Sequence, residues 1–305
     1  MAPDLAHFGP DGLPDLTGTT AVVTGANSGI GFHTARALAE HGAEVVLACR
    51  NVDSARAAAV KLPGITRVEE LDLASQKSVH AFAERFAGPL DLLVNNAGVM
   101  TPPKYRETAE CHELQFGTNH LGHFALTGLL LPALLAAPSP RVVTVASIAH
   151  HRGDESVVEG NPESSYVAAK AYGNSKLANV LFARELHRRA TEAGSRLVST
   201  GAHPGVSATN LVGSPDGMGA NKIVQLAAPY FMPVLFQSSA AGANPTLWAS
   251  SFAEGGSYVG PVQLRESRGR LGAAKLSRHA RNEELAQALW TVSEKETGVS
   301  FDLTD

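Results

Sequence analysis

The chain has 305 residues, of which 44% are hydrophobic and 18% charged, and this balance predicts a globular protein with a substantial core. Its formal net charge of -4, with no long Lys/Arg cluster, argues against nucleic acid as a partner. Two cysteines, Cys49 and Cys111, are too few for a disulfide scaffold and fit a reducing compartment.

The ends of the sequence and its apolar stretches bear on membrane association. Residues 1–16 lack the basic and apolar regions of a secretion signal. The longest apolar stretch, 223–236, contains Pro229 and Pro233 and is shorter than the roughly 20 residues that a spanning helix needs. We therefore expect a cytoplasmic protein without a membrane span.

Short runs rich in β-branched residues alternate with longer helical segments from Thr20 onward. The alternation predicts a doubly wound parallel sheet of the Rossmann type, with helices on both faces. The expected strands are 20–25, 43–49, 66–73, 90–98, 140–147, 195–205 and one near 257–261. The expected helices are 31–42, 54–62, 75–87, 110–135, one containing 164–182, 242–253 and 282–296.

No shift in composition divides the sequence, so we expect one domain over 1–305. The loop-like segment at about 205–236 is predicted to be a lid, because ligands of open α/β sheets bind outside the carboxyl ends of the strands. The C-terminal extension, about 262–305, is expected to be a basic tail followed by the final helix.

The turn "TGANSGIG" carries glycines at 25, 29 and 31 between the first strand and the first helix. Gly25 permits a tight turn, while Gly29 and Gly31 let backbone and helix approach a pyrophosphate bound at the helix N-terminus. In isolation such a turn is a weak signal, and it also occurs as a plain connection. Its place in the strand-helix order favours nucleotide binding.

The second strand ends in Cys49 and Arg50, where a fold that prefers a free ribose usually offers a carboxylate. A guanidinium fits a 2'-phosphate, so the sequence favours NADP(H) over NAD(H), unless Arg50 is only a solvated surface charge. Asp72, after the third strand, is expected to accept a hydrogen bond from adenine. Its alternative role is that of an acid at a helix N-terminus.

The pattern Tyr-x-x-x-Lys occurs twice, as Tyr166/Lys170 and as Tyr172/Lys176. The tyrosines are six residues apart, roughly 240° around a helix, so one helix cannot aim both at the same ligand. Tyr166 is expected in the first helical turn after a cap at 164–165, as a wall of the substrate pocket or plain surface. Tyr172 lies deeper in the helix, and we predict that it is the acid/base.

Seven motifs in order resemble the short-chain dehydrogenase/reductase family over nearly the whole chain. They are "TGANSGIG", "LDL", "NNAG", "NHLGHF", "VASIAH", "AYGNSKLAN" and "HPG". The pieces "ACRN", "SKLANVLF" and "ARNEELAQALW" add a closer likeness to the branch of retinol dehydrogenases, WW-domain oxidoreductases and protochlorophyllide reductases. The family pattern "YxxSK" fits only the pair Tyr172/Lys176.

The resemblance implies an NAD(P) cofactor, hydride transfer to or from a carbonyl or alcohol carbon, and a catalytic tetrad of Asn119, Ser147, Tyr172 and Lys176. It also implies that Asn95, Gly98 and Thr209 contact the cofactor. With the turn and strand ends included, the expected cofactor-binding residues are Gly25, Asn27, Ser28, Gly29, Ile30, Gly31, Arg50, Asp72, Leu73, Asn95, Ala97, Gly98, Tyr172, Lys176, Pro204, Gly205, Val206 and Thr209.

The tetrad residues suit carbonyl reduction, which needs a proton donor at the substrate oxygen. A Tyr with a reference pKa of about 10 needs a nearby ammonium to reach its phenolate form near neutrality, and Lys176 is expected to supply it. Ser147 is expected to hydrogen-bond the substrate oxygen, its alternative role being a strand cap. Asn119 is expected to hold a water that links to Lys176, or to be a locally satisfied helix residue.

Histidines at 120, 123, 150, 151 and 203 invite a metal interpretation, but no ligand set with nearby carboxylates or thiolates closes around them, and we expect no metal. His203 is expected to pack beside the cofactor or to cap a strand end. Val206 stands where the resemblance to protochlorophyllide reductases calls for Cys, which argues against their photochemistry.

We therefore expect an NADPH-dependent carbonyl reductase, or the reverse alcohol dehydrogenase, acting on an apolar small molecule. The apolar segment 226–236 supports an apolar pocket, although a subunit or membrane-surface contact would use the same residues. A retinoid substrate is disfavoured, because retinol dehydrogenases of this branch typically carry an N-terminal anchor that is not seen here. The resemblance also implies a homo-oligomer. The alternative function is that of a non-catalytic dinucleotide sensor or scaffold.

Overall fold

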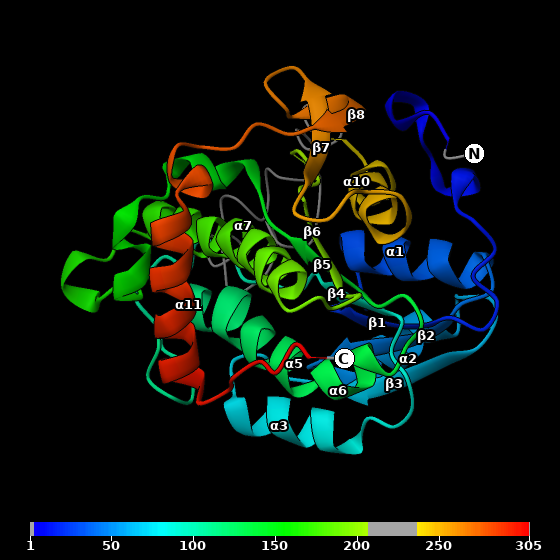
Figure 1. Cartoon of the computed structure of the whole chain (residues 1–305), viewed down its shortest axis with the longest axis horizontal. Coiled ribbons are helices and arrows are strands. Elements are labelled where there is room, and N and C mark those ends of the chain that lie inside the picture. Colours follow the sequence, from blue (N-terminus) through cyan, green and yellow to red (C-terminus); the bar gives the residue numbers. More distant parts are fainter. Residues whose placement is uncertain (1–2, 207–236, 305) are drawn as a thin grey trace.

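A computed structural model describes residues 3–206 and 237–304 of the protein. One eight-stranded sheet forms its centre, in the order β3-β2-β1-β4-β5-β6-β7-β8 (Figure 1). The strands are β1 (Thr20–Thr24), β2 (Glu44–Cys49), β3 (Thr66–Glu70), β4 (Leu92–Asn95), β5 (Arg141–Val145), β6 (Val198–Ala202), β7 (Tyr258–Gln263) and β8 (Arg268–Ala273). Neighbouring strands are parallel except for the β7–β8 pair. The doubly wound parallel sheet is confirmed.

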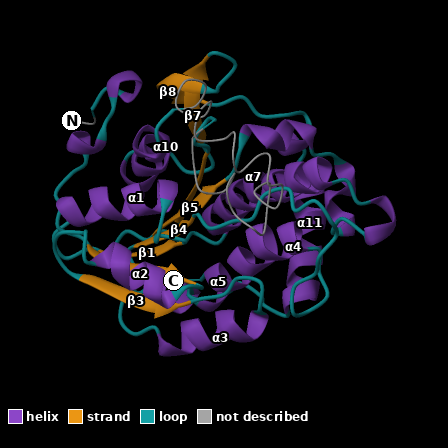
Figure 2. Ribbon diagram, turned by 180° about the vertical axis from the view of Figure 1, so that it is seen from behind, coloured by secondary structure: helices purple, strands orange, loops and turns teal. Residues whose placement is uncertain are grey.

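Helices cover both faces of the sheet (Figures 1 and 2). One face carries α1 (Gly29–Glu40), α2 (Val52–Ala59) and α10 (Ser239–Ser251). The other carries α3 (Gln76–Arg85), α5 (Gly122–Leu129), α7 (Ala168–Glu192) and α11 (Glu283–Thr297). Shorter helices are α4 (Leu114–Phe116) and α6 (Leu131–Leu135), the π-helical turn η3 (Gly117–Leu121), and the 3-10 turns η1 (Leu5–His7), η2 (Pro10–Gly12), η4 (Ile148–Arg152), η5 (Glu155–Glu159), η6 (Glu163–Ser165) and η8 (His279–Arg281).

The inner strands are continuous apolar runs because both of their faces are buried. On the α7 side, α11 packs its Trp290 against Phe124 of α5 and Phe182 of α7, with ring centroids 5.0 and 5.9 Å apart. Burying side chains of this size contributes about 1.5–3 kcal/mol each. The C-terminal helix is therefore part of the core.

The structure departs from the sequence expectations in three places. The prediction of a basic tail is wrong in part, because residues 268–273 form β8, which pairs with β7. In the loop between these strands, Leu264, Arg265 and Glu266 all have positive φ. The helix expected over 110–135 begins only at Leu114 and contains the π-helical turn. α7 begins at Ala168, so position 166 precedes the helix, whereas we had expected it in the first turn.

The predicted lid, about 205–236, and with it Thr209, falls almost entirely outside the described residues. Among residues 3–206 and 237–304, no helix has the length and apolar character needed to cross a bilayer.

Candidate active site

The turn between β1 and α1 is a cradle for a phosphate group. Gly25 and Gly29 have φ values of 66° and 58°, a region that side chains strongly disfavour. A Cβ on Gly31 would stand 2.5 Å from the Gly25 carbonyl oxygen, so only glycine allows this close approach. Ser28 precedes α1 without a side-chain cap bond, which leaves the first N–H groups of the helix to bind an anion.

A cavity opens from this cradle along the carboxyl ends of β1, β2, β4 and β5 and reaches α7. This is the switch point of the sheet order, where ligands of such folds bind. The expected cofactor residues that line it are Gly25, Asn27, Ser28, Gly29, Ile30, Gly31, Arg50, Asp72, Leu73, Ala97, Gly98, Tyr172, Lys176 and Pro204. The glycine turn at the N-terminus of α1 and the polar residues along the cavity fit a nucleotide cofactor.

Three other expected cofactor residues are described but do not line the cavity. Asn95 is fully buried at the end of β4 and donates to Thr127 Oγ1 at 3.0 Å. Gly205 and Val206 instead face the β7–β8 loop, where the Val206 N–H donates to the Ser267 carbonyl at 2.8 Å. The next residue, Asn96, lines the cavity instead.

Cys49 and Arg50 line the cavity together at the carboxyl end of β2. Burial raises the pKa of the Cys49 thiol, and the nearby backbone N–H groups of Asn27, Ala26 and Gly25 offset this only in part. A neutral thiol therefore supports the turn where an acidic side chain would repel a phosphate. Asp72 lines the cavity and also accepts from Ala74 N at 3.0 Å, so part of its carboxylate holds the turn before α3.

Tyr172 and Lys176 project from the first half of α7 into the cavity. The Lys176 Nζ lies 5.8 Å from the centre of the Tyr172 ring and donates to the Val145 carbonyl at 3.3 Å. Ser147, just beyond β5, lies near enough to the Tyr172 hydroxyl to lower its pKa. Ser147 does not line the cavity itself, yet the structure brings these three predicted residues together.

The protonation behaviour of this pair differs from the expectation. Burial raises the pKa of Tyr172 to about 12, and the side chain of Ser147 offsets this only in part. Burial also lowers the pKa of Lys176 to about 8. The expected lowering of the Tyr172 pKa by the ammonium is therefore not found in the protein alone, because desolvation outweighs it.

Asn119 occupies the π-helical turn η3, and its side chain makes three hydrogen bonds within the protein. Its Oδ1 accepts from Val99 N at 2.7 Å, and its Nδ2 donates to the Val99 carbonyl and to Ser175 Oγ, both at 2.9 Å. Ser175 Oγ in turn donates to the Tyr172 carbonyl at 2.9 Å. Asn119 thus ties the loop after β4 to α7, and its Oδ1 and its backbone carbonyl, which accepts from His123 Nδ1, each accept one bond and keep a second lone pair that could bind a water.

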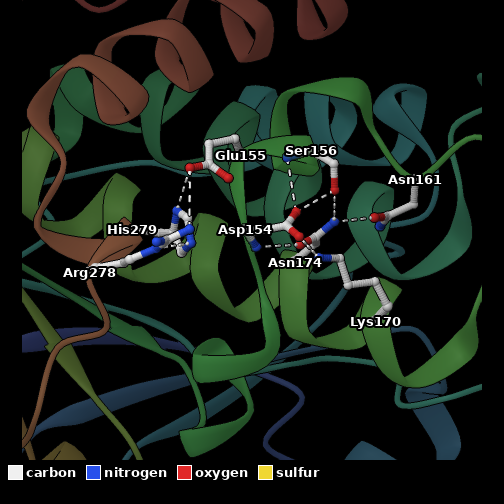
Figure 3. A network of polar contacts seen from close by, with 8 residues as sticks. All are labelled: Asp154, Glu155, Ser156, Asn161, Lys170, Asn174, Arg278 and His279. Carbon is white, nitrogen blue, oxygen red and sulfur yellow. Dashed lines mark hydrogen bonds and ion pairs between the residues drawn. The ribbon is translucent and has the colours of Figure 1, made fainter.

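The other Tyr-x-x-x-Lys pair points elsewhere. Lys170 forms an ion pair with Asp154, within a network that includes Asn174 (Figure 3). The Tyr166 hydroxyl donates to the Pro102 carbonyl at 3.0 Å, and neither member of the pair lines the cavity. The two pairs therefore make different contacts, and of the two only Tyr172/Lys176, the pair that fits the family pattern, lines the cavity.

The buried histidines serve as hydrogen-bonding groups within the protein. His123 Nδ1 donates to the Asn119 carbonyl at 2.9 Å, so its Nε2 accepts from Thr24 Oγ1, also at 2.9 Å. Thr24 Oγ1 then accepts from the N–H groups of Asn96 and Ala97, each at 2.9 Å. The described part of the chain contains no cluster of His, Cys, Asp and Glu that could hold a metal.

Sequence reasoning missed several residues of the site. Thr118 and Asn96 line the cavity, and Ser175 and Thr24 hold it by hydrogen bonds. Asn96 and Ser175 lie inside recognised motifs, and the step from a strand end to the following loop would have indicated Asn96. Thr24 bonds residues about 70 positions or more away in the sequence, and Thr118 lies in the π-helical turn η3. No local sequence pattern indicates either role.

Comparisons with known proteins agree with this geometry. The family model described as short chain dehydrogenase matches residues 19–216. Retinol dehydrogenase 11 of Mus musculus is 39% identical over 300 residues, covering 94% of this chain and 89% of the relative. Retinol dehydrogenase 12 of Homo sapiens is 37% identical over 314 residues, covering 99% and 95%.

Solved structures agree as well. The crystal structure of an uncharacterised protein from Mycobacterium paratuberculosis has a TM-score of 0.82 and 42% identity, covering 97% of this chain and 99% of the other. A structure described as an NAD(P)-dependent gluconate 5-dehydrogenase from Beutenbergia cavernae, with bound NADP, has a TM-score of 0.57 and 28% identity, covering 78% and 91%. The chain belongs to the short-chain dehydrogenases, grouping with their retinol dehydrogenase branch, and is an NAD(P)-dependent enzyme that acts on CH–OH or C=O groups.

Proposed function

We propose that the protein is an NADPH-dependent carbonyl reductase in which Tyr172 protonates the substrate oxygen. The observation that carries the proposal is that Tyr172 and Lys176 line the cavity that begins at the glycine turn, with Ser147 near the Tyr172 hydroxyl. Bound NADPH would supply the hydride. The protein supplies the proton, the orientation of the carbonyl and the stabilisation of charge on its oxygen.

The chain's own residues divide these tasks. Tyr172, whose pKa is raised to about 12, stays protonated near neutrality and can act as the acid in reduction. Ser147, whose side chain lowers the pKa of the same hydroxyl, would donate to the substrate oxygen and stabilise the developing alkoxide. Lys176 is buried beside the Tyr172 ring and favours the phenolate left after proton transfer.

The preference for NADP(H) rests on Arg50, which lines the cavity next to Cys49, at the strand end where a fold that prefers a free ribose usually offers a carboxylate. A guanidinium can contact a 2'-phosphate in two places, whereas a thiol offers little to a free ribose hydroxyl. Binding of NADP by a described structural relative is consistent with this proposal.

The substrate is proposed to be an apolar carbonyl compound or alcohol. The named relatives are retinol dehydrogenases, so retinal belongs in any panel despite our sequence-based doubt about retinoids. Cytoplasmic location and pairing of copies stay predictions. Pairing through α5 and α7 must accommodate α11, which packs against both helices.

The test is to mix the purified protein with NADPH deuterated at nicotinamide C4 and a panel of aldehydes and ketones that includes retinal. The proposal expects deuterium at the new carbinol carbon, detected by mass spectrometry, and a higher kcat/KM with NADPH than with NADH. Cofactor binding without label transfer to any carbonyl would refute the proposal and favour the dinucleotide sensor or scaffold.

A further inference from the structure

The imidazole of His150 contacts the backbone of Ser147, the predicted catalytic serine, which lies three residues earlier in the sequence. His150 belongs to η4, the 3-10 turn that begins after Ser147, and is 0% exposed. Its Nδ1 lies 2.8 Å from the Ser147 carbonyl oxygen, and its Nε2 lies 3.3 Å from the Ser277 backbone N–H nitrogen. A buried ring thus joins the catalytic loop to the segment after β8.

These two partners fix the tautomer of His150. A carbonyl oxygen only accepts, so Nδ1 must carry the proton that it donates to Ser147. A backbone N–H only donates, so Nε2 must be bare to accept from Ser277. Burial lowers the pKa of His150 to about 4, so the ring stays neutral in this tautomer near neutrality.

The hydrogen bond from His150 to the Ser147 carbonyl orients the residue whose hydroxyl lies near that of Tyr172. The Ser147 carbonyl also accepts from the His150 N–H at 3.0 Å, and Ser147 Oγ accepts from Ala149 N at 3.1 Å. With that N–H directed at its oxygen, the Ser147 hydroxyl is left to donate its proton toward Tyr172 or a substrate oxygen. Both the backbone and the hydroxyl of Ser147 are thereby held in one orientation.

The loop that carries His150 is itself firmly seated on α7. A Cβ on Gly153 would stand 2.9 Å from the Gly173 carbonyl, and one on Gly173 would stand 3.1 Å from the Ala149 carbonyl. Glu155 adds a second link to the C-terminal segment through His279, at 3.3 Å (Figure 3). These contacts hold the loop against α7 and the C-terminal segment. The ring of His150 adds a further contact, to the backbone N–H of Ser277.

We propose that His150 is a positioning residue for carbonyl reduction, which orients Ser147 through the Nδ1–H bond to its carbonyl and is itself oriented by the Ser277 N–H. The inference rests on the proposed function. It predicts that the C-terminal segment around Ser277, remote from the cofactor, contributes to the geometry of proton transfer.

The first test is independent of turnover. With histidine labelled by 15N, the ring nitrogens of His150 are assigned by the loss of their signals in His150→Asn and are followed by NMR from pH 5.5 to 7.5. The proposal expects a protonated Nδ1 and a bare Nε2 throughout. An Nε2-protonated or charged ring at pH 7 overturns it.

The second test compares a variant that keeps a donor near the position of Nδ1 with variants that lose it. Asn places a donor near the position of Nδ1, so His150→Asn should keep kcat within about threefold, while His150→Gln and His150→Ala lose about tenfold with KM for NADPH unchanged. In a Ser147→Ala background, His150→Gln should cause no further loss. Equal losses in all three variants, or losses that multiply with Ser147→Ala, overturn the proposal.

The two tests also separate this inference from the proposed function. An inactive native protein refutes the carbonyl reductase, and the NMR measurement then judges the hydrogen bond alone. If His150→Ala fails to fold, the Asn and Gln variants and the NMR spectrum of the native protein still decide.

Discussion

Four buried histidines make the fold sensitive to mild acid. Burial lowers the pKa of His120 and His203 to about 3 and that of His123 and His150 to about 4, from a usual value of 6.5. Because the folded pKa lies below the unfolded one, the unfolded chain takes up protons first. The stability that these groups contribute is complete above about pH 6.5 and is lost as pH falls below it.

The size of the effect follows from these values. At pH 5.5 each histidine costs about 1.4 kcal/mol relative to neutral pH, so four cost about 5–6 kcal/mol. That equals the whole stability of a weakly stable protein, about 5–15 kcal/mol. Burial also lowers the pKa of the half-buried His33 and His187, which adds to the effect, whereas Glu113, whose pKa burial raises, acts in the opposite direction.

The assay is urea unfolding at pH 7.5 and pH 5.5, followed by the fluorescence of the buried Trp248 and Trp290. We expect the free energy of unfolding to fall by about 5 kcal/mol between the two pH values. His120→Phe, which removes one of the four titrating rings from an aromatic cluster, should reduce this difference by about a quarter. A change of less than about 1 kcal/mol in the native protein would refute the reasoning.

Three further predictions concern the cavity. Arg50→Ala should raise KM for NADPH by about 10- to 100-fold and leave KM for NADH unchanged in steady-state assays; an equal change for both cofactors would contradict the role given to Arg50. Gly31→Ala should weaken NADPH binding by about tenfold or more in fluorescence titrations, whereas Gly9→Ala, whose added Cβ meets nothing within 4 Å, should not; tight binding by the Gly31 variant would count against the cradle. Lys176→Met should lower kcat by about 10²- to 10⁴-fold, while Lys170→Met, which loses a partly exposed ion pair, should stay within about threefold; similar losses in both would contradict the assignment.

Local patterns predicted most of the fold because they reflect local physics. The strands β1, β2, β4 and β5 are runs of buried, mostly apolar residues, and the turn before α1 needs glycines for its backbone angles. β8 escaped prediction because its sequence, "RGRLGA", buries only Leu271, and its pairing with β7 depends on partners elsewhere in the chain. The start of α7 was placed too early, because Val167 and not a serine precedes the helix.

The candidate site, like the fold, could be predicted from the sequence only in part. Motifs predicted the residue types that meet in the cavity, Tyr172, Lys176 and the cradle of glycines, because their spacing along one element sets their geometry. Motifs could not predict that burial would raise the pKa of Tyr172, since desolvation depends on the whole surrounding structure. Nor could they place Asn119 in a π-helical turn or connect His150 to Ser277, 127 positions later.

The measurement that tests the central claim most directly compares two tyrosines that begin the same sequence pattern. Tyr172→Phe and Tyr166→Phe each remove one hydroxyl, and both are assayed for carbonyl reduction and for NADPH binding. We predict that Tyr172→Phe lowers kcat by at least about 100-fold with unchanged NADPH affinity, and that Tyr166→Phe, which loses its bond to the Pro102 carbonyl, stays within about threefold. Full turnover by Tyr172→Phe, or its loss in Tyr166→Phe alone, would contradict the account.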